Sequence, residues 1–142
     1  MSNKLLVAID FSPVSLRAVQ YAVDFVKGSD RTIDLLHVTQ DPLPAHAIAH
    51  APEEVLEQVR EGEQHRAMAK LDEVMQTIPE PHRGRAILRR GPPAETICEE
   101  AGNGYDLVVI STHGRTGLSQ FFIGSVAERV VRLAPTPVLV VR

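Results

Sequence analysis

The segment Asp106–Val126 has the sequence DLVVISTHGRTGLSQFFIGSV, and it predicts a strand, a loop that contains glycines, and the start of a helix. The apolar run 107–110 is too short for a helix and has polar residues on both sides, so we expect a buried strand. After the loop, apolar residues recur at helical spacing: Val126, Val130, Val131 and Ala134. A strand, a glycine-containing loop and a helix start form the general geometry of a phosphate-binding loop, because free N–H groups and the positive end of the helix face the anion.

Two better-known phosphate loops do not match this segment. The pattern G-x-x-x-x-G-K-[ST] needs a lysine before Ser or Thr at its second glycine, and none stands there. The pattern G-x-G-x-x-G is also missing, because Gly102-Asn103-Gly104 comes before the strand and lacks the third glycine. What remains is Gly114, nine intervening residues, and then Gly124-Ser125.

This spacing resembles the mark of the universal stress protein family, G-x2-G-x9-G-[ST] after the fourth strand. Ser111 stands in this chain where the family has its first glycine. The resemblance extends from VAIDFS at residues 7–12 to PVLVV at residues 137–141. It implies one universal stress protein domain over residues 1–142, with an adenine nucleotide alpha hydrolase-like fold.

Composition and charge restrict the class of protein. A chain of 142 residues is long enough for one domain with a real core. Its net charge of -3 argues against a nucleic-acid-binding surface, which is usually strongly basic. The single cysteine, Cys98, fits a reducing compartment. We find no apolar run of the ~18–20 residues that a membrane span needs, and the N-terminus lacks a signal-peptide core, so we expect a cytoplasmic protein without membrane contact.

The remaining elements follow from periodicity and from start and stop signals. We expect strands at 4–10, 32–38, 85–90, 107–110 and 138–141, with helices after Ser12-Pro13, Glu53, Pro93 and Gly124. Alternation of strands and helices predicts a doubly wound α/β fold with one parallel sheet and right-handed crossovers. Together with the family resemblance, it predicts five strands in the order 3-2-1-4-5.

Some details of these elements can be tested directly. The first helix should end at Gly28 and bury one stripe: Ala18, Ala22, Phe25 and Val26. The arginines around strand 85–90 suggest a place near the sheet edge, solvated or in an interface. Residues 39–51 read as a long loop, typical of a lid or an interface segment. His46 and His50 in that loop have a possible zinc spacing, but no cysteine or carboxylate pattern completes a site.

In the order 3-2-1-4-5, the first and fourth strands are neighbours at the point where the winding reverses. Ligands of such sheets bind in the crevice beyond the carboxyl ends of the strands at this point. Asp10 and the glycine loop should therefore face the same crevice. Two separate features of the sequence thus predict one site.

The family resemblance gives the residues of this crevice their roles. Asp10 matches the position that contacts ribose, and the backbone of Val38 the position that meets the adenine edge. Arg115 could reach the distal phosphates. The expected nucleotide-binding residues are Ala8, Ile9, Asp10, Val38, Ile110, Ser111, Gly114, Arg115, Gly124, Ser125 and Val126. Plainer interpretations remain beside these: Asp10 as a turn residue, Ser125 as a helix cap, and Cys98 as part of the core.

Ser111 is the departure from the family pattern. If the family glycine contributes only its N–H group, serine keeps that donor, and binding should survive. If the site needs a positive φ or a missing Cβ at this position, the affinity should fall.

The predicted ligand is ATP or a related adenine nucleotide, with any magnesium carried by the nucleotide. Asp10 is the one carboxylate that we place in the crevice, and no lysine accompanies it, which argues against fast phosphoryl transfer. Three functions stay in view: a regulatory stress-response module that holds ATP with little turnover, a slow ATPase or nucleotide-transferring enzyme, and a stress protein that acts through protein contacts without nucleotide. An apolar edge strand at residues 137–142 predicts a homodimer, as the family's dimers also imply. A further protein partner is expected but not identified by the sequence.

Overall fold

The computed structural model describes residues 2–41, 43–112 and 123–142. Its elements in chain order are β1 (Lys4–Ala8), α1 (Pro13–Val26), β2 (Thr32–Thr39), α2 (Ala45–His50), α3 (Glu53–Gln76), the short 3-10 helix η1 (Glu80–His82), β3 (Arg83–Arg90), α4 (Pro93–Ala101), β4 (Leu107–Ser111), α5 (Ser125–Leu133) and β5 (Val138–Val141). The five strands form one sheet in the order β3-β2-β1-β4-β5, and every neighbouring pair is parallel. The predicted α/β class and strand order are therefore confirmed.

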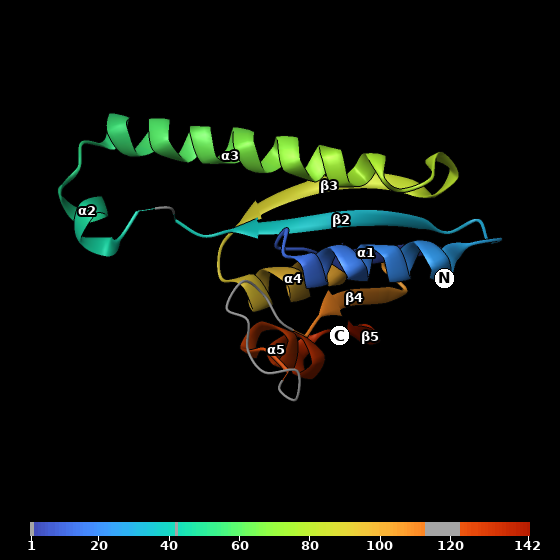
Figure 1. Cartoon of the computed structure of the whole chain (residues 1–142). Coiled ribbons are helices and arrows are strands. Elements are labelled where there is room, and N and C mark those ends of the chain that lie inside the picture. Colours follow the sequence, from blue (N-terminus) through green and yellow to red (C-terminus); the bar gives the residue numbers. More distant parts are fainter. Residues whose placement is uncertain (1, 42, 113–122) are drawn as a thin grey trace.

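Helices cover both faces of the sheet (Figure 1). One core cluster joins α1 and α3 to the sheet, and a second joins α4 and α5 to its other face. Successive residues of the central strand alternate between them, with Leu5 and Val7 in the first cluster and Leu6 and Ala8 in the second. Because both of its faces are buried, β1 is apolar from Leu5 to Ala8.

Helix α1 begins and ends where the sequence predicts. The Ser12 hydroxyl accepts a hydrogen bond from the Ser15 amide, Pro13 occupies the first turn, and Gly28 follows the helix with a φ of 75°. The predicted buried stripe is wrong at Phe25, whose side chain is 51% exposed and lies under the Arg31 guanidinium. The buried positions are instead Ser15, Ala18, Val19, Ala22, Val23 and Val26.

The long loop predicted at residues 39–51 is partly wrong, because it contains the short helix α2. Helix α2 and the beginning of α3 project beyond the carboxyl ends of the strands (Figure 1). The guanidinium of Arg60 in α3 holds this segment through an ion pair of 2.9 Å with Asp41. Within the described ranges, no helix combines the length and apolar character that crossing a bilayer needs.

Strand β3 lies at one edge of the sheet, as its arginines suggested. Its pairing with β2 contains a bulge, where Asp34 on β2 opposes Gly84 and Arg85 on β3. A Cβ at Gly84 would lie 2.0 Å from Asp34 Oδ1 and 2.7 Å from the Ile33 carbonyl oxygen, so no side chain fits there. Strand β5 forms the opposite edge.

Candidate functional site

A cleft of about 700 Å³ opens at the carboxyl ends of β1, β2 and β4. Its place matches the crevice expected at the switch of winding direction, between the neighbouring strands β1 and β4. Nine of the predicted site residues line it: Ala8, Ile9, Asp10, Val38, Ile110, Ser111, Gly124, Ser125 and Val126. The other two, Gly114 and Arg115, lie outside the described residues, as do His113 and Gly117.

One side of the cleft is apolar. It is built where the strand ends meet α4 and α5, and its lining comprises Ala8, Leu36, Val38, Pro93, Ile97, Ile110, Val126 and Ala127. Most of these side chains belong to the core cluster on that face of the sheet. A wall of this kind suits a flat, largely apolar group such as a nucleobase.

Asp10 follows β1 and forms the turn that leads into α1. Its Oδ1 accepts a hydrogen bond of 2.9 Å from the Ser12 amide. The hydroxyl of Ser15 lies 3.3 Å from the Asp10 amide and accepts from it. The interpretation of Asp10 as a turn residue is therefore confirmed, while its carboxylate still borders the cleft.

Phe11 and His37 are cleft residues that the sequence analysis did not assign to the site. His37 Nδ1 donates a hydrogen bond of 2.8 Å to the Ile9 carbonyl, which accepts only, and this fixes the ring against the end of β1. Phe11 has a φ of 65°, which a bulky side chain rarely adopts. Its ring centroid lies 4.5 Å from that of His37. No sequence pattern marks a strained phenylalanine, although its place directly after Asp10 is a hint.

The N-terminus of α5 closes the cleft. Gly124, not Ser125, occupies the N-cap position, so the interpretation of Ser125 as the cap is wrong. The Gly124 amide donates to the Thr112 carbonyl, and helical bonding begins with the Glu128 amide, which donates to the Gly124 carbonyl at 3.0 Å. The three amides between them, at residues 125–127, thus precede the helical ladder and are available to an anion at the positive end of the helix. The helix predicted from the spacing of Val126, Val130 and Val131 is present, with Val130 buried and Val131 half exposed.

Helix α3 supplies a charged wall that the sequence analysis missed. Glu63, Arg66, Ala67 and Lys70 all line the cleft. Their spacing puts them on one stripe of the helix. The argument from a single carboxylate without a lysine is therefore wrong. The only available signal was the stripe itself, and charged residues at such spacing usually form a solvated face.

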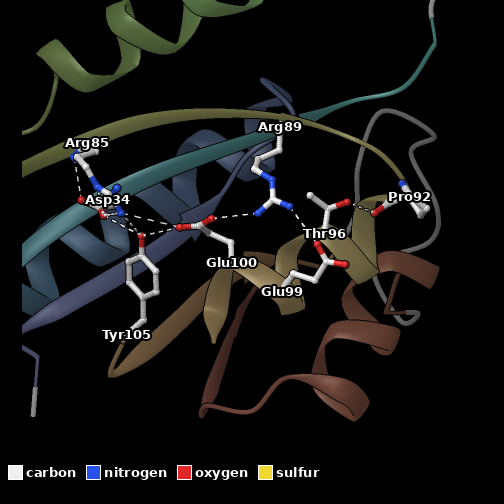
Figure 2. Close-up of polar contacts among 8 residues, drawn as sticks. All are labelled: Asp34, Arg85, Arg89, Pro92, Thr96, Glu99, Glu100 and Tyr105. Carbon is white, nitrogen blue, oxygen red and sulfur yellow. Dashed lines mark hydrogen bonds and ion pairs between the residues drawn. The ribbon is translucent and has the colours of Figure 1, made fainter. Parts of the chain in front are cut away.

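A second polar cluster lies away from the cleft, between β2, β3 and α4 (Figure 2). Asp34, almost fully buried, accepts hydrogen bonds from the Arg85 amide at 2.7 Å and from the Tyr105 hydroxyl at 2.8 Å. The same hydroxyl lies 3.2 Å from Glu100 Oε1, and Arg89 reaches the other oxygen of Glu100 at 3.2 Å. Two of the arginines of β3 therefore pair with buried carboxylates, although the Arg85 side chain stays 62% exposed.

This network has a structural role. Burial and the neighbouring Asp34 carboxylate raise the pKa of Tyr105, so its hydroxyl stays neutral and donates. Arg89 also pairs with Glu99 at 3.0 Å, so the outer face of α4 is tied to the edge strand (Figure 2). At the start of α4, the Thr96 hydroxyl donates to the Pro92 carbonyl at 2.7 Å. Fixing α4 also fixes the apolar wall of the cleft, to which this helix contributes.

Neither cysteine nor histidine chemistry adds a second site in the described part of the chain. Burial raises the pKa of the Cys98 thiol, and its side chain packs against the second core cluster, as expected of a core residue. His46 and His50 do lie on a helix, α2. Among the described residues, however, no group of three or more histidine, cysteine, aspartate or glutamate side chains could hold a metal ion.

Known proteins resemble this chain over its whole length. The model of a family described as the universal stress protein family matches residues 1–142. A universal stress protein of Bacillus subtilis (strain 168), YxiE, is 30% identical over 148 aligned positions, which cover all of both chains. A universal stress protein of Thermus aquaticus, described as lying in the QAH/OAS sulfhydrylase 3'region, is 33% identical and also covers both chains completely.

Solved structures have the same fold. Protein MJ0577 of Methanocaldococcus jannaschii superposes with a TM-score of 0.83 at 26% identity, over 99% of this chain and 96% of that one. A universal stress protein in complex with cAMP gives a TM-score of 0.62 at 23% identity, over 98% and 95% of the two chains. The universal stress protein of Archaeoglobus fulgidus in complex with dAMP gives 0.63 at 19% identity, over 98% and 97%. At these last two identities the likeness concerns the fold alone.

Proposed function

This chain belongs to the universal stress protein family, and from that premise we propose that it is a stress-response module that binds ATP in the cleft with little or no turnover. The observation that carries the proposal is the convergence of nine predicted contact residues, from three strands and the start of α5, on one cavity. Its volume of about 700 Å³ lies within the usual range for small-molecule sites. Proteins of this fold form complexes with cAMP and dAMP, which supports an adenine nucleotide as the ligand class.

The base and the ribose would lie over the strand ends. The apolar wall suits the adenine ring, and the backbone of Val38 at the end of β2 suits hydrogen bonding to its edge. Asp10 would accept hydrogen bonds from ribose hydroxyls, because its carboxylate borders the cleft and a carboxylate can accept several hydrogen bonds, such as the one from the Ser12 amide. Ala8 and Ile9 would line the base pocket between them.

The phosphates would lie at the N-terminus of α5. The amides of residues 125–127 and the helix dipole favour negative charge there. The side chain of Ser125 is exposed and borders the cleft, so its hydroxyl can add a donor. We assign Gly114 and Arg115 to the same phosphates, as the family pattern implies, with any magnesium carried by the nucleotide.

The signal would pass to a protein partner through the surfaces next to the cleft. Helix α2 and the start of α3 project beyond the carboxyl ends of the strands (Figure 1), and α3 also lines the cleft, so a ligand that contacts α3 can bias their position. We also propose a cytoplasmic homodimer through residues 137–142, because β5 is an apolar edge strand. A light-scattering mass equal to one chain at micromolar concentration would refute the dimer.

Isothermal titration with ATP and magnesium tests the binding proposal. We expect saturable heat with the wild type and a loss of affinity of about tenfold in Asp10→Asn, because the neutral amide accepts a weaker hydrogen bond than the carboxylate. Asparagine keeps an acceptor oxygen for the Ser12 amide, so the turn should be preserved. Asp24→Asn is the matched control, because Asp24 is an exposed residue in a surface ion pair with Lys27. Absence of heat with the wild type at high ATP concentration would support a stress protein that acts through protein contacts alone.

A second candidate function is slow turnover of the bound nucleotide. The observation in its favour is that Glu63 and Lys70 line the same cleft as Asp10. A second carboxylate and an ammonium group are the residue types that phosphoryl transfer uses. Phosphate release by the purified protein, abolished by metal removal, would favour this enzyme over the regulatory module.

A further inference from the structure

The cleft has two walls of different chemistry. Its apolar wall and the start of α5 lie on the α4 and α5 face of the sheet, and together they account for a base and its phosphate chain. The opposite wall is the α3 stripe of Glu63, Arg66, Ala67 and Lys70, which we call the α3 wall. Nothing in the proposed placement of ATP uses these charged side chains.

The α3 wall carries a net positive charge. Arg66 forms an ion pair with Glu63, which lies three residues earlier on the same helix. Lys70 lies one turn further along the helix, beside Arg66 on the same stripe. With two cations and one carboxylate on the α3 wall, the positive charge of Lys70 exceeds what Glu63 can balance.

Lys70 is held toward the cleft by an aromatic ring. Its Nζ lies 5.7 Å from the centroid of the Phe11 ring, within the range of a cation–π contact. Phe11 reaches this position through its left-handed backbone conformation, and its ring also contacts His37. Strained conformations of this kind persist where surrounding structure enforces them, and they cluster at ligand sites. The strain here places an aromatic support under the lysine at the cleft margin.

We propose that the α3 wall is a phosphate subsite of the cleft, separate from the N-terminus of α5, with Arg66 and Lys70 as its donors. The guanidinium offers a planar fork for two phosphate oxygens, and the ammonium adds a compact charge. The phosphate can be the terminal group of the nucleotide itself, or it can belong to a second molecule bound beside the nucleotide. The first source rests on the proposed function, and the second does not require it.

Calorimetric titrations of the whole chain distinguish the two sources. ATP, AMP and pyrophosphate are titrated into the wild type, Arg66→Gln and Lys70→Gln, and pyrophosphate also into protein saturated with AMP. Lys27→Gln is the matched control, since Lys27 is a surface lysine outside the cleft that loses the same charge. Circular dichroism checks folding, which should be unchanged because Arg66 and Lys70 are exposed residues of a helix surface.

We expect each cleft variant to weaken the phosphate contact about tenfold, the usual size for a hydrogen bond to a charged group. If ATP affinity falls and AMP affinity does not, the subsite holds the nucleotide's own terminal phosphate. If both nucleotides bind unchanged but the variants lose pyrophosphate binding, the subsite holds a separate molecule. If the wild type binds pyrophosphate through Lys70 and binds no nucleotide, the subsite stands and the proposed function fails.

Three results would overturn the proposal. The first is unchanged binding of all three ligands in both variants. The second is an equal loss for ATP and AMP, which would place the two side chains at the base or ribose. The third is an equal loss of affinity in Lys27→Gln, which would mean that the effect comes from the net charge of the protein and not from the cleft.

Discussion

The network around Asp34 and the cleft beside Asp10 both gather acidic and basic side chains, but their polar atoms face different surroundings. In the network, each buried carboxylate meets donors from the protein: Asp34 meets Arg85 and Tyr105, and Glu100 meets Arg89. In the cleft, the charged groups border a cavity of about 700 Å³. Burial and clustering of titratable groups therefore do not by themselves indicate a binding site. The charged groups must also border a cavity that can hold a ligand.

The network also supports one wall of the cleft. The network fixes the bulge of β3 at Gly84 and ties α4 to the sheet edge, so it sets the position of the apolar wall of the cleft. None of the network residues Asp34, Arg85, Glu100 and Tyr105 lines the cleft itself. Mutations in the network that leave the Arg89 pairs in place should thus affect stability more than binding, whereas mutations in the cleft should affect binding.

The largest expected effect comes from Asp34→Ala. The change leaves the buried Tyr105 hydroxyl and the Arg85 amide without their shortest acceptor, which should lower the free energy of unfolding by about 3 kcal/mol. Urea denaturation measures this loss. Asp24→Ala removes an exposed ion pair of 3.4 Å and should cost less than about 1 kcal/mol.

Asp34→Ala also tests whether the network and the cleft contribute to different properties of the protein. Below the unfolding transition, Asp34→Ala should bind ATP as the wild type does, because Asp34 is not a cleft residue and the pairs of Arg89 with Glu99 and Glu100, which hold α4, remain in the variant. Loss of ATP binding by Asp34→Ala that is still folded in the absence of urea would contradict this division, and it would make the network part of the site.

Most of the fold could be predicted from the sequence, because its signals are local. The apolar runs at 5–8 and 107–110 specify central strands, and Ser12-Pro13 and Gly28 specify the limits of α1. The prediction that Phe25 is buried was wrong, because periodicity alone does not decide which of two adjacent helical positions faces the core. An aromatic ring at the margin of the core can instead be covered by an arginine such as Arg31.

Only one side of the site could be predicted, namely the side formed by the segments that carry the family's sequence motif. The strand ends and the start of α5 were expected, and they do line one cleft. The α3 wall was missed because it forms through tertiary packing, which brings Lys70 to Phe11 across 59 residues of sequence. Likewise, nothing local shows that Asp34, in a strand that reads as apolar, finds its partners on β3 and after α4.

A smaller effect should appear at alkaline pH. The fold raises the pKa of Tyr105 above the ordinary value of about 10, chiefly by burial and then by its bond to Asp34. The stabilisation is therefore complete below pH ~10 and is lost as the pH rises from there toward the folded pKa, by up to about 1.4 kcal/mol per pH unit.

Urea titrations at pH 8 to 11 in the wild type and in Tyr105→Phe measure this slope. The variant should lose less stability over the alkaline part of the range, whereas Tyr21→Phe, which alters the other, exposed tyrosine, should follow the wild type. Equal slopes in all three proteins would mean that the Tyr105 hydroxyl is not held neutral by the network.

The smallest effect is expected at Ser111, where this chain departs from the family glycine. Ser111 is the last residue of β4 and pairs with Val141 on β5, and the non-glycine residues with positive φ in the described part of the chain are Asn3 and Phe11. The position thus has an ordinary extended backbone and does not require glycine. Ser111→Gly should change ATP affinity less than about threefold and should lower stability by about 0.5–1 kcal/mol, because glycine is unfavourable inside a strand. Calorimetry and urea denaturation measure the two quantities, and a gain in affinity of tenfold or more would show instead that the serine Cβ obstructs the ligand.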